Sequence, residues 1–207
     1  MTTAVKICGI TRQADAAAAA RAGAHALGFV FCAKSPRCVT AATAAEVVKG
    51  LPPFVTAVGL FVNPAARDVE NILRDVPLGL LQFHGEEPPE FCAQFGPPYI
   101  KAARVKAGVD LLQYARIYGS ARGLLLDAYV DGTHGGTGTA FDWSLIPRGL
   151  PLPLILSGGL NPGNVADAVR RIAPWAVDVS SGVEASPGIK DAEKIAAFMK
   201  EVRSADV

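Results

Sequence analysis

The sequence predicts an α/β fold, a single (β/α)8 barrel of near-minimal size that spans residues 1–207. Three observations predict it. Eight short apolar runs recur along the chain, helical patterns stand between them, and no composition break or low-complexity linker divides the sequence. The runs are often apolar on both faces, which is typical of parallel strands buried on both sides. The rival fold is a doubly wound open sheet with one strand wrongly assigned, and the count of eight strands favours the barrel.

The predicted strands extend from the N-terminal region to residue 180 and are rich in Val, Ile, Leu and Phe. They cover residues 3–8, 26–31, 54–62, 78–83, 99–105, 123–128, 152–157 and 175–180. The first of them, "TAVKIC", ends in a cysteine that is followed directly by a glycine.

Apolar residues at the spacing i, i+3, i+4, i+7 predict three helices between or after these strands. They are Val69, Ile72, Leu73 and Val76; Val165, Ala168, Val169 and Ile172; and Ile195, Phe198, Met199 and Val202. Asn161 followed by Pro162 predicts the N-cap and first turn of the second of these helices. Weaker patterns predict helices over 12–22, 40–50, 88–95 and 109–118, and only a short one over 142–146.

Composition and charge exclude several classes of protein. Half of the residues are hydrophobic and 19% are charged, as in an ordinary globular protein. A net charge of +1 gives no basic surface for nucleic acid or an anionic membrane. No uncharged apolar run is long enough to span a membrane, and no secretory signal is recognised at the N-terminus. We therefore expect a cytosolic protein without a nucleic-acid, membrane or obligate protein partner.

The cysteines and histidines favour neither disulfides nor a metal site. Cys8, Cys32, Cys38 and Cys92 form no CxxC pair, so free thiols are expected. Cys32 and Cys92 are expected to be small buried hydrophobic residues. The three histidines, His25, His84 and His134, lack the spacing of metal ligands.

Two glycine-containing turns predict a phosphate site. Gly158 and Gly159 follow the seventh strand, and Ser180, Ser181 and Gly182 follow the eighth. Glycines let backbone N–H groups approach an anion closely, and barrels often bind phosphate at these two loops. The alternative is that both are merely tight turns.

A third glycine-rich stretch, "DGTHGGTGTAFDW" over residues 131–143, follows the sixth strand. Long loops in compact domains are usually functional or disordered. We interpret it as a mobile lid with Gly135, Gly136 and Gly138 as its flexible points; a surface loop without a role is the alternative.

Cys8 and Asp127 stand where catalytic groups of a barrel are expected, at the carboxyl ends of the first and sixth strands. A carboxyl group at the end of an apolar strand tends to have a raised pKa, which suits a general acid. Either residue alone has a structural alternative, a loop-capping Asp or an inert buried Cys. Together they could face one cavity and move a proton between two atoms of a substrate.

Seven motifs carry a family resemblance from Lys6 to Asp191. They are "KICGITR", "LGFVFCAKSPR", "LFVN", "LQFHGEE", "LLLDA…GGTGTAFDW", "LSGGLNPGNV" and "VDVSSGVEASPGIKD". In this order they resemble the phosphoribosylanthranilate isomerases of tryptophan biosynthesis. Phe83 in "QFHG" departs from the family pattern, where Leu is more usual.

The resemblance implies an Amadori rearrangement that needs no cofactor and no metal. The substrate would be the phosphosugar N-(5-phosphoribosyl)anthranilate and the product 1-(2-carboxyphenylamino)-1-deoxyribulose 5-phosphate. Asp127 would protonate the ribose ring oxygen, and the Cys8 thiolate would remove the proton from sugar C2. For this work the pKa of each group must move toward neutrality.

The resemblance also implies the substrate contacts. Arg37 matches the position that holds the anthranilate carboxylate, for which a guanidinium fork is suited. Gln82, His84 and Asp178 are candidate pocket residues, and a structural hydrogen bond is an equal alternative for His84. Lys6, on the same strand face as the thiol, either favours the thiolate or fills the barrel interior.

Two other functions compete with this interpretation. A pentose-phosphate epimerase would use metal-binding His and Asp residues on several strands, and metal analysis would reveal it. A non-catalytic phosphosugar-binding protein could share the fold, because fold does not determine function. A turnover assay separates that protein from an isomerase.

Overall fold

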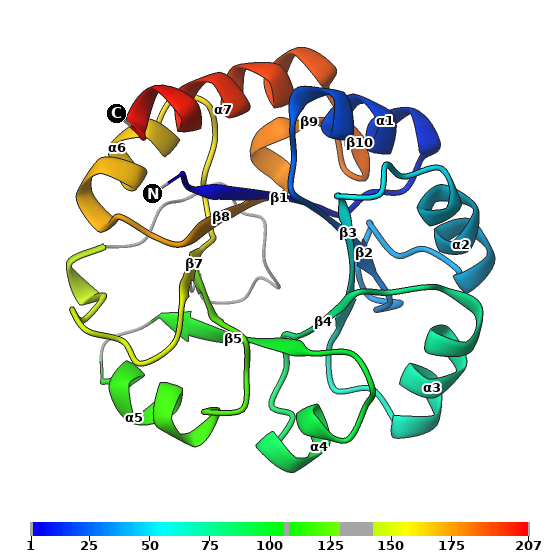
Figure 1. The fold of residues 1–207 in the computed structure, drawn as a ribbon, viewed down its shortest axis with the longest axis horizontal. Helices are drawn as coiled ribbons and strands as arrows, with labels where there is room; N and C mark the ends of the chain where they lie inside the picture. The colour runs from blue at the N-terminus through cyan, green and yellow to red at the C-terminus, as the bar shows by residue number, and fades with distance from the viewer. Residues whose placement is uncertain (1, 106–107, 129–142, 207) are drawn as a thin grey trace.

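The computed structural model describes residues 2–105, 108–128 and 143–206. Eight parallel strands form a closed barrel in the order β1 to β8, and the helices lie around it (Figure 1). The ring closes because β1 pairs with both β2 and β8. This closure confirms the predicted barrel and excludes the open doubly wound sheet.

The elements alternate along the chain as predicted. The strands are β1 (Ala4–Cys8), β2 (Ala26–Val30), β3 (Thr56–Phe61), β4 (Leu80–Phe83), β5 (Tyr99–Val105), β6 (Leu124–Ala128), β7 (Leu154–Leu156) and β8 (Ala176–Val179). The helices are α1 (Gln13–Ala22), α2 (Ala41–Lys49), α3 (Ala66–Asp75), α4 (Pro89–Ala93), α5 (Leu111–Ile117), α6 (Val165–Ile172) and α7 (Ala192–Ala205). Two short 3-10 helices, η1 (Trp143–Leu145) and η2 (Ser181–Val183), and a small hairpin of β9 (Glu184–Ser186) and β10 (Ile189–Lys190) complete the list.

Strand alternation decides which polar side chains enter the barrel. Leu125 and Ala176 belong to a small apolar cluster inside the barrel, separate from the large core between strands and helices. Because successive side chains of a strand point to opposite faces, Asp127 and Asp178, two residues further along β6 and β8, also face inward. Both are buried. The barrel interior is therefore apolar at its centre and polar toward the carboxyl ends of its strands.

The periodicities predict the buried faces of α6 and α7, whereas in α3 only Val69 of the predicted face is buried within the helix, Ile72 and Leu73 are half-buried, and Val76 lies just beyond the helix end. In α7, Ile195, Phe198, Met199 and Val202 are all buried. In α6, Val165, Ala168 and Val169 are buried in the same way. These faces pack on the outer surface of the barrel, where burial of apolar side chains stabilises the fold by about 25 cal/mol per Å² removed from water.

The prediction that Asn161 caps α6 is wrong. The helix begins at Val165, with Asn164 as its N-cap residue. The side chain of Asn161 instead accepts the N–H of Gly163 within the turn after β7. Asn164 donates to the carbonyl of Gly159 and ties the helix start to that turn. The helix is delayed because Asn161 is used in a local side-chain turn.

Other differences from the sequence prediction are small. Strand β3 begins at Thr56, and Phe54, predicted to start the strand, is 94% exposed.

All four cysteines are free; Cys92 is buried as expected, whereas Cys32 is only half-buried and Cys38 is exposed. The predicted lid over residues 131–143 falls, except for Trp143, outside the described residues.

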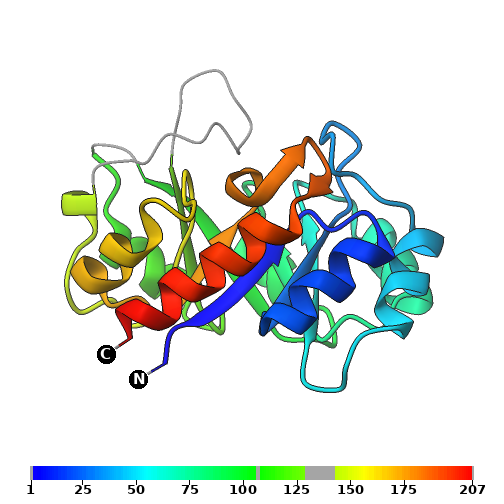
Figure 2. The same ribbon diagram turned by 90° about the horizontal axis from the view of Figure 1, so that it is seen from above.

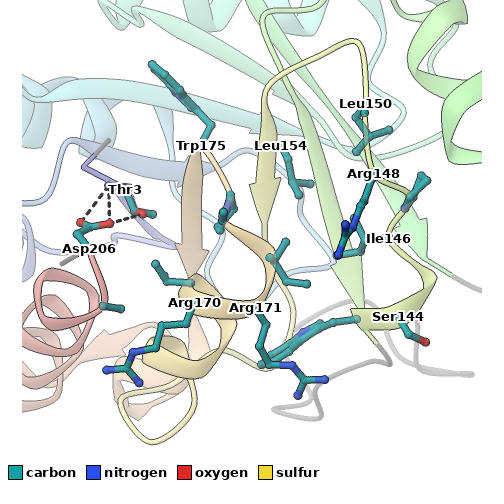
Figure 3. Close-up of a pocket in the computed structure, with 18 of the residues that line it drawn as sticks. Thr3, Ser144, Ile146, Arg148, Leu150, Leu154, Arg170, Arg171, Trp175 and Asp206 are labelled. Atoms are coloured by element: carbon teal, nitrogen blue, oxygen red, sulfur yellow. Dashed lines mark hydrogen bonds between the residues drawn. The ribbon is translucent and has the colours of Figure 1, made fainter.

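A cleft lies at the amino end of the strands, where η1 is the only described helix between β6 and β7 (Figure 3). It is lined by residues that precede β7 and β8, by α6 and by both terminal segments, among them Leu154, Arg170 and Trp175. The N–H and hydroxyl of Thr3 bond there to the carboxylate of Asp206. The two termini lie at this end and the β9–β10 hairpin at the other (Figure 2). Of the described residues that line the cleft, none is a predicted site residue.

Over the part of the chain that the structure describes, no helix is long and apolar enough to span a membrane.

Candidate active site

Cys8 is the last residue of β1 and lies in a small cluster with Val30 and Leu60 near the carboxyl ends of the strands. Asp127 lies near the end of β6, three strands away around the ring. Both are buried to more than nine-tenths. The structure therefore places the two predicted catalytic residues at the same end of the barrel, facing its interior from different sides.

The surroundings of Cys8 include a buried ion pair. The Nζ atom of Lys6 lies 2.8 Å from Oδ1 of Asp178, and the hydroxyl of Ser157 donates to Oδ2 at 3.2 Å. Both oxygens of Asp178 thus have partners within the protein. Asp178 balances the charge of Lys6, which is the positive charge closest in sequence to the thiol.

The pKa of Cys8 moves in the direction opposite to the expected one. Burial of the thiol raises it above its ordinary value, and this effect outweighs the opposing charges of Lys6 and Lys190. The Asp178 carboxylate raises it further. Lys6 itself lowers this pKa, in line with the first of the two alternatives given for it, but burial and Asp178 together outweigh the nearby ammonium groups, so the net shift is away from neutrality.

This direction leads to a prediction about alkylation. Only the thiolate reacts with iodoacetamide, so the rate at Cys8 should rise with pH and reach half its maximum above about 8.5, the ordinary value for a thiol. Peptide mass spectrometry at a series of pH values, read at the Cys8 peptide, measures it. Bound product should slow the reaction. A midpoint below about 8.5 would contradict the assigned direction.

Asp127 is bonded to a histidine on another strand. Oδ2 of Asp127 lies 3.1 Å from Nε2 of His84, and Nδ1 of the same ring lies 3.0 Å from Nε2 of Gln82. Gln82 is completely buried, and its Oε1 atom has no hydrogen-bond partner in the part of the chain that the structure describes. The structure thus brings three predicted site residues into one row.

A buried ion pair that the sequence analysis missed holds the backbone beside His84. Lys101 is fully buried on the outer face of β5, and its Nζ lies 2.8 Å from Glu87 and 2.6 Å from the carbonyl of Gly85. Glu87 accepts the N–H of Gly85 in turn. A lysine inside the apolar run "YIKAARV" could have indicated such a pair, since buried lysines are almost always paired.

Arg37 lies across the end of β1. Its guanidinium makes two hydrogen bonds to Glu184, at 2.8 and 2.7 Å. A side chain at Gly9 would place its Cβ 2.5 Å from Cδ of Arg37, so a glycine is needed there. Lys190 also donates to Glu184, at 2.8 Å. Two cations share one anion, which leaves net positive charge beside Cys8.

Glu184 and Lys190 are further residues that the sequence analysis did not assign. Burial raises the pKa of Glu184, but hydrogen bonds from Arg37 and Lys190 outweigh it, so the net shift is downward. Burial lowers the pKa of Lys190. The two stand in the short β9–β10 hairpin, which no periodicity could reveal. Their charges within "GVEASPGIKD" were the available signal.

The two glycine turns lie against each other. A Cβ atom at Gly182 would collide with the carbonyl oxygen of Leu160, so the turn after β8 touches the turn after β7. Within the described residues, the N–H groups of Gly158, Gly159, Ser181 and Gly182 donate no hydrogen bond. Four backbone donors are therefore available over a short stretch of the barrel mouth.

Within residues 2–105, 108–128 and 143–206, no group of three His, Cys, Asp or Glu side chains is placed to hold a metal ion.

The chain is similar to known proteins over nearly all of its length. The family model for N-(5'-phosphoribosyl)anthranilate isomerase matches residues 5–201. The N-(5'-phosphoribosyl)anthranilate isomerase of Nitrosospira multiformis is 61% identical over 202 residues, 98% of this chain and 97% of the relative. The crystal structure of the phosphoribosyl anthranilate isomerase of Thermotoga maritima has a TM-score of 0.90 at 42% identity, covering 98% of this chain and 99% of that one.

A second solved structure contains a ligand. It is a phosphoribosyl anthranilate isomerase in complex with reduced 1-(o-carboxyphenylamino)-1-deoxyribulose 5-phosphate. Its TM-score is 0.85 at 41% identity, again over 98% of this chain and 99% of the other. By the match of the family model and by these identities, the chain belongs to the N-(5'-phosphoribosyl)anthranilate isomerase family.

Proposed function

We propose that Cys8 and Asp127 are the general base and the general acid of a phosphoribosylanthranilate isomerase. The enzyme acts in tryptophan biosynthesis and converts N-(5-phosphoribosyl)anthranilate to 1-(2-carboxyphenylamino)-1-deoxyribulose 5-phosphate. The observation that carries the residue assignment is the placement of Cys8 and Asp127 on β1 and β6, both facing the interior at one end of the barrel.

The reaction begins with ring opening. Protonated Asp127 gives its proton to the ribose ring oxygen, the bond from C1 to that oxygen breaks, and the nitrogen lone pair forms an iminium ion. The carboxyl group is left as a carboxylate, whose oxygen Oδ2 faces the imidazole of His84. A positioned acid is effective here because it is already within the site when charge develops on the leaving oxygen.

Proton removal from C2 follows. The Cys8 thiolate takes the proton, the electrons of the C–H bond form a C1–C2 double bond, and the iminium nitrogen regains its lone pair. The resulting enolamine tautomerises to the ketone. In the free protein, burial raises the pKa of Cys8 and opposes the thiolate. During the reaction, the positive charge of the iminium ion next to C2 favours the thiolate.

The substrate is bound through its two anionic ends. We assign the anthranilate carboxylate to Arg37. Arg37 and Lys190 share the single negative charge of Glu184, so this cluster carries net positive charge that can attract the carboxylate. We assign the phosphate to the adjacent turns at Gly158, Gly159, Ser180, Ser181 and Gly182, where the N–H groups of Gly158, Gly159, Ser181 and Gly182 donate no hydrogen bond among the described residues. Gln82, His84 and Asp178 line the interior between these ends.

We infer further that the whole chain acts as one domain in the cytosol, without nucleic acid, membrane or an obligate protein partner. Free cysteines support a reducing compartment. The closed barrel draws its strands from almost the whole described chain, which supports a single domain.

The substrate assignment of Arg37 gives a prediction. Arg37→Ala should lower kcat/KM for phosphoribosylanthranilate by roughly 10- to 100-fold, since a hydrogen-bonded charged contact contributes about 1.5–3 kcal/mol. Glu184 keeps Lys190 as a partner, so the variant should fold. For phosphoribosylaniline, which lacks the carboxylate, the substitution should lower kcat/KM much less.

Arg171→Ala is the control, since Arg171 is exposed and pairs with Asp167 on α6, far from the carboxyl ends. An equal loss for phosphoribosylanthranilate and phosphoribosylaniline in Arg37→Ala would assign the arginine a role other than carboxylate recognition.

The function as a whole is tested by the decrease of anthranilate fluorescence as purified enzyme consumes phosphoribosylanthranilate. The expected result is turnover without added metal and in the presence of a chelator. Binding of the reduced product without turnover would identify a non-catalytic phosphosugar-binding protein instead.

A further inference from the structure

The row of Gln82, His84 and Asp127 serves a purpose beyond substrate contact. We propose that His84, supported by Gln82, is a positioning residue for Asp127: it fixes the carboxyl group in the barrel mouth and shares with it the proton that ring opening consumes. The proposal rests on the role of Asp127 as general acid. In this proposal His84 acts on the general acid, Asp127, and does not bind the substrate.

The row follows from strand alternation. Gln82 and His84 are two residues apart at the end of β4, so both face the barrel interior. Asp127 faces the same interior from β6, on the far side of β5. The Nε2 atom of His84 thus reaches Oδ2 of Asp127 at 3.1 Å, while Nδ1 stays 3.0 Å from the Gln82 amide. Each ring nitrogen has one polar partner.

The ring nitrogens link the proton of Asp127 to the amide of Gln82. When Asp127 is a carboxylate, Nε2–H of a neutral imidazole donates to it, and Nδ1 must accept from the Gln82 N–H. If the pair gains a proton on the ring, or if the carboxyl O–H donates to Nε2, Nδ1 becomes a donor and needs an acceptor. Nε2 then either accepts from the protonated carboxyl or donates to the carboxylate. The proton can therefore lie on either member of the pair.

Gln82 can serve both states. In the structure its Nε2 faces the imidazole, and its Oε1 is buried without a hydrogen bond among the described residues. An unpaired buried oxygen is costly. Rotation of the amide by half a turn would present this oxygen to Nδ1–H once the pair is protonated. A methionine or leucine of similar size would fill the space but could serve neither state.

The backbone beside His84 is held firmly enough for such a role. The N–H of His84 donates to the carbonyl of Phe61 on the neighbouring strand β3, at 2.9 Å. Gly85, the next residue, is held through both its N–H and its carbonyl by the buried Glu87–Lys101 pair. The imidazole is therefore presented to Asp127 by a fixed segment of chain.

A double-mutant cycle tests the proposal. His84→Ala in the wild-type enzyme should lower kcat by about 10- to 100-fold, the order of loss for a misplaced catalytic group, with little change in KM. In an Asp127→Asn background the same substitution should change kcat by no more than about twofold, because the group it acts through is gone. Gln82→Met should give a smaller loss of the same kind. His84→Gln, which keeps an N–H donor, should recover part of kcat.

One control and a binding measurement complete the design. His25→Ala removes a histidine whose Nδ1 accepts the N–H of Val5 near the start of β1, and should leave kcat unchanged. Affinity for the reduced product should be unchanged in His84→Ala.

The proposal would be overturned if His84→Ala raised KM, weakened binding of the reduced product, or lowered kcat equally in both backgrounds. Each of these results would indicate that His84 contacts the substrate. Unchanged kcat in both His84→Ala and Gln82→Met would overturn it as well. If instead Asp127→Asn alone keeps wild-type kcat, the role of Asp127 itself has failed, which is a separate result.

Discussion

Cys8→Ser is expected to lower kcat by at least about 100- to 10,000-fold, the contribution typical of a positioned acid or base. A serine hydroxyl is a far weaker base than a thiolate. The proton on C2 of the sugar would then have no effective acceptor. Steady-state fluorescence assays at matched concentrations of folded protein measure the loss.

Cys32→Ser is the matched control for this prediction. Cys32 packs against the same small cluster as Cys8 but is only half-buried and has no assigned role in the reaction. It should retain turnover near that of the wild type, as should Cys92→Ser if it folds. Circular dichroism checks that Cys8→Ser keeps the fold, which we expect because the change is small and lies at a strand end. If Cys8→Ser kept near-normal kcat, the thiol would be structural and another base would be required.

Asp127→Asn is expected to lose most activity, again by about 100- to 10,000-fold. The amide keeps the shape of the carboxyl group and can still accept the Nε2–H of His84, so the local structure should persist. It cannot give a proton to the ribose ring oxygen, so the ring should stay closed. Affinity for the reduced product should remain, because that ligand is already an open chain.

Asp167→Asn on the exposed face of α6 is the control for this carboxylate, since Asp167 only pairs with Arg171 at the surface. Isothermal titration with the reduced product, together with kcat, separates loss of chemistry from loss of binding. Weak binding with preserved kcat would show that Asp127 holds the substrate and that the acid lies elsewhere.

The two carboxylates inside the barrel illustrate how far sequence reasoning reaches. Asp127 was expected to face a cavity from the end of its strand, and Asp178 was a candidate pocket residue; both face the barrel interior. Sequence alone could not separate their surroundings. Asp178 makes hydrogen bonds with Lys6 and Ser157, whereas Asp127 is hydrogen-bonded to the partly buried His84. The difference arises because strand register decides which neighbours each carboxylate meets.

Helix and strand assignments show a similar limit. The apolar faces of α6 and α7 are local patterns and were predicted, but the start of α6 was placed three residues too early. The cap depends on Asn164 reaching Gly159 and on Asn161 turning back on Gly163. Both contacts belong to the turn after β7, whose shape is set by its packing against the turn after β8.

The sequence by itself determined the barrel, the end of it at which the candidate site residues lie, and the family to which the chain belongs. Those features depend on periodicity and on motifs, which are local properties of the chain. Only the tertiary structure decided that Glu184 holds Arg37 across 147 positions of sequence, and that Glu87 and Lys101 hold the segment beside His84. It also decided that the pKa of Cys8 is raised and not lowered. These depend on which charges closure of the barrel brings together and on how much water it excludes from them.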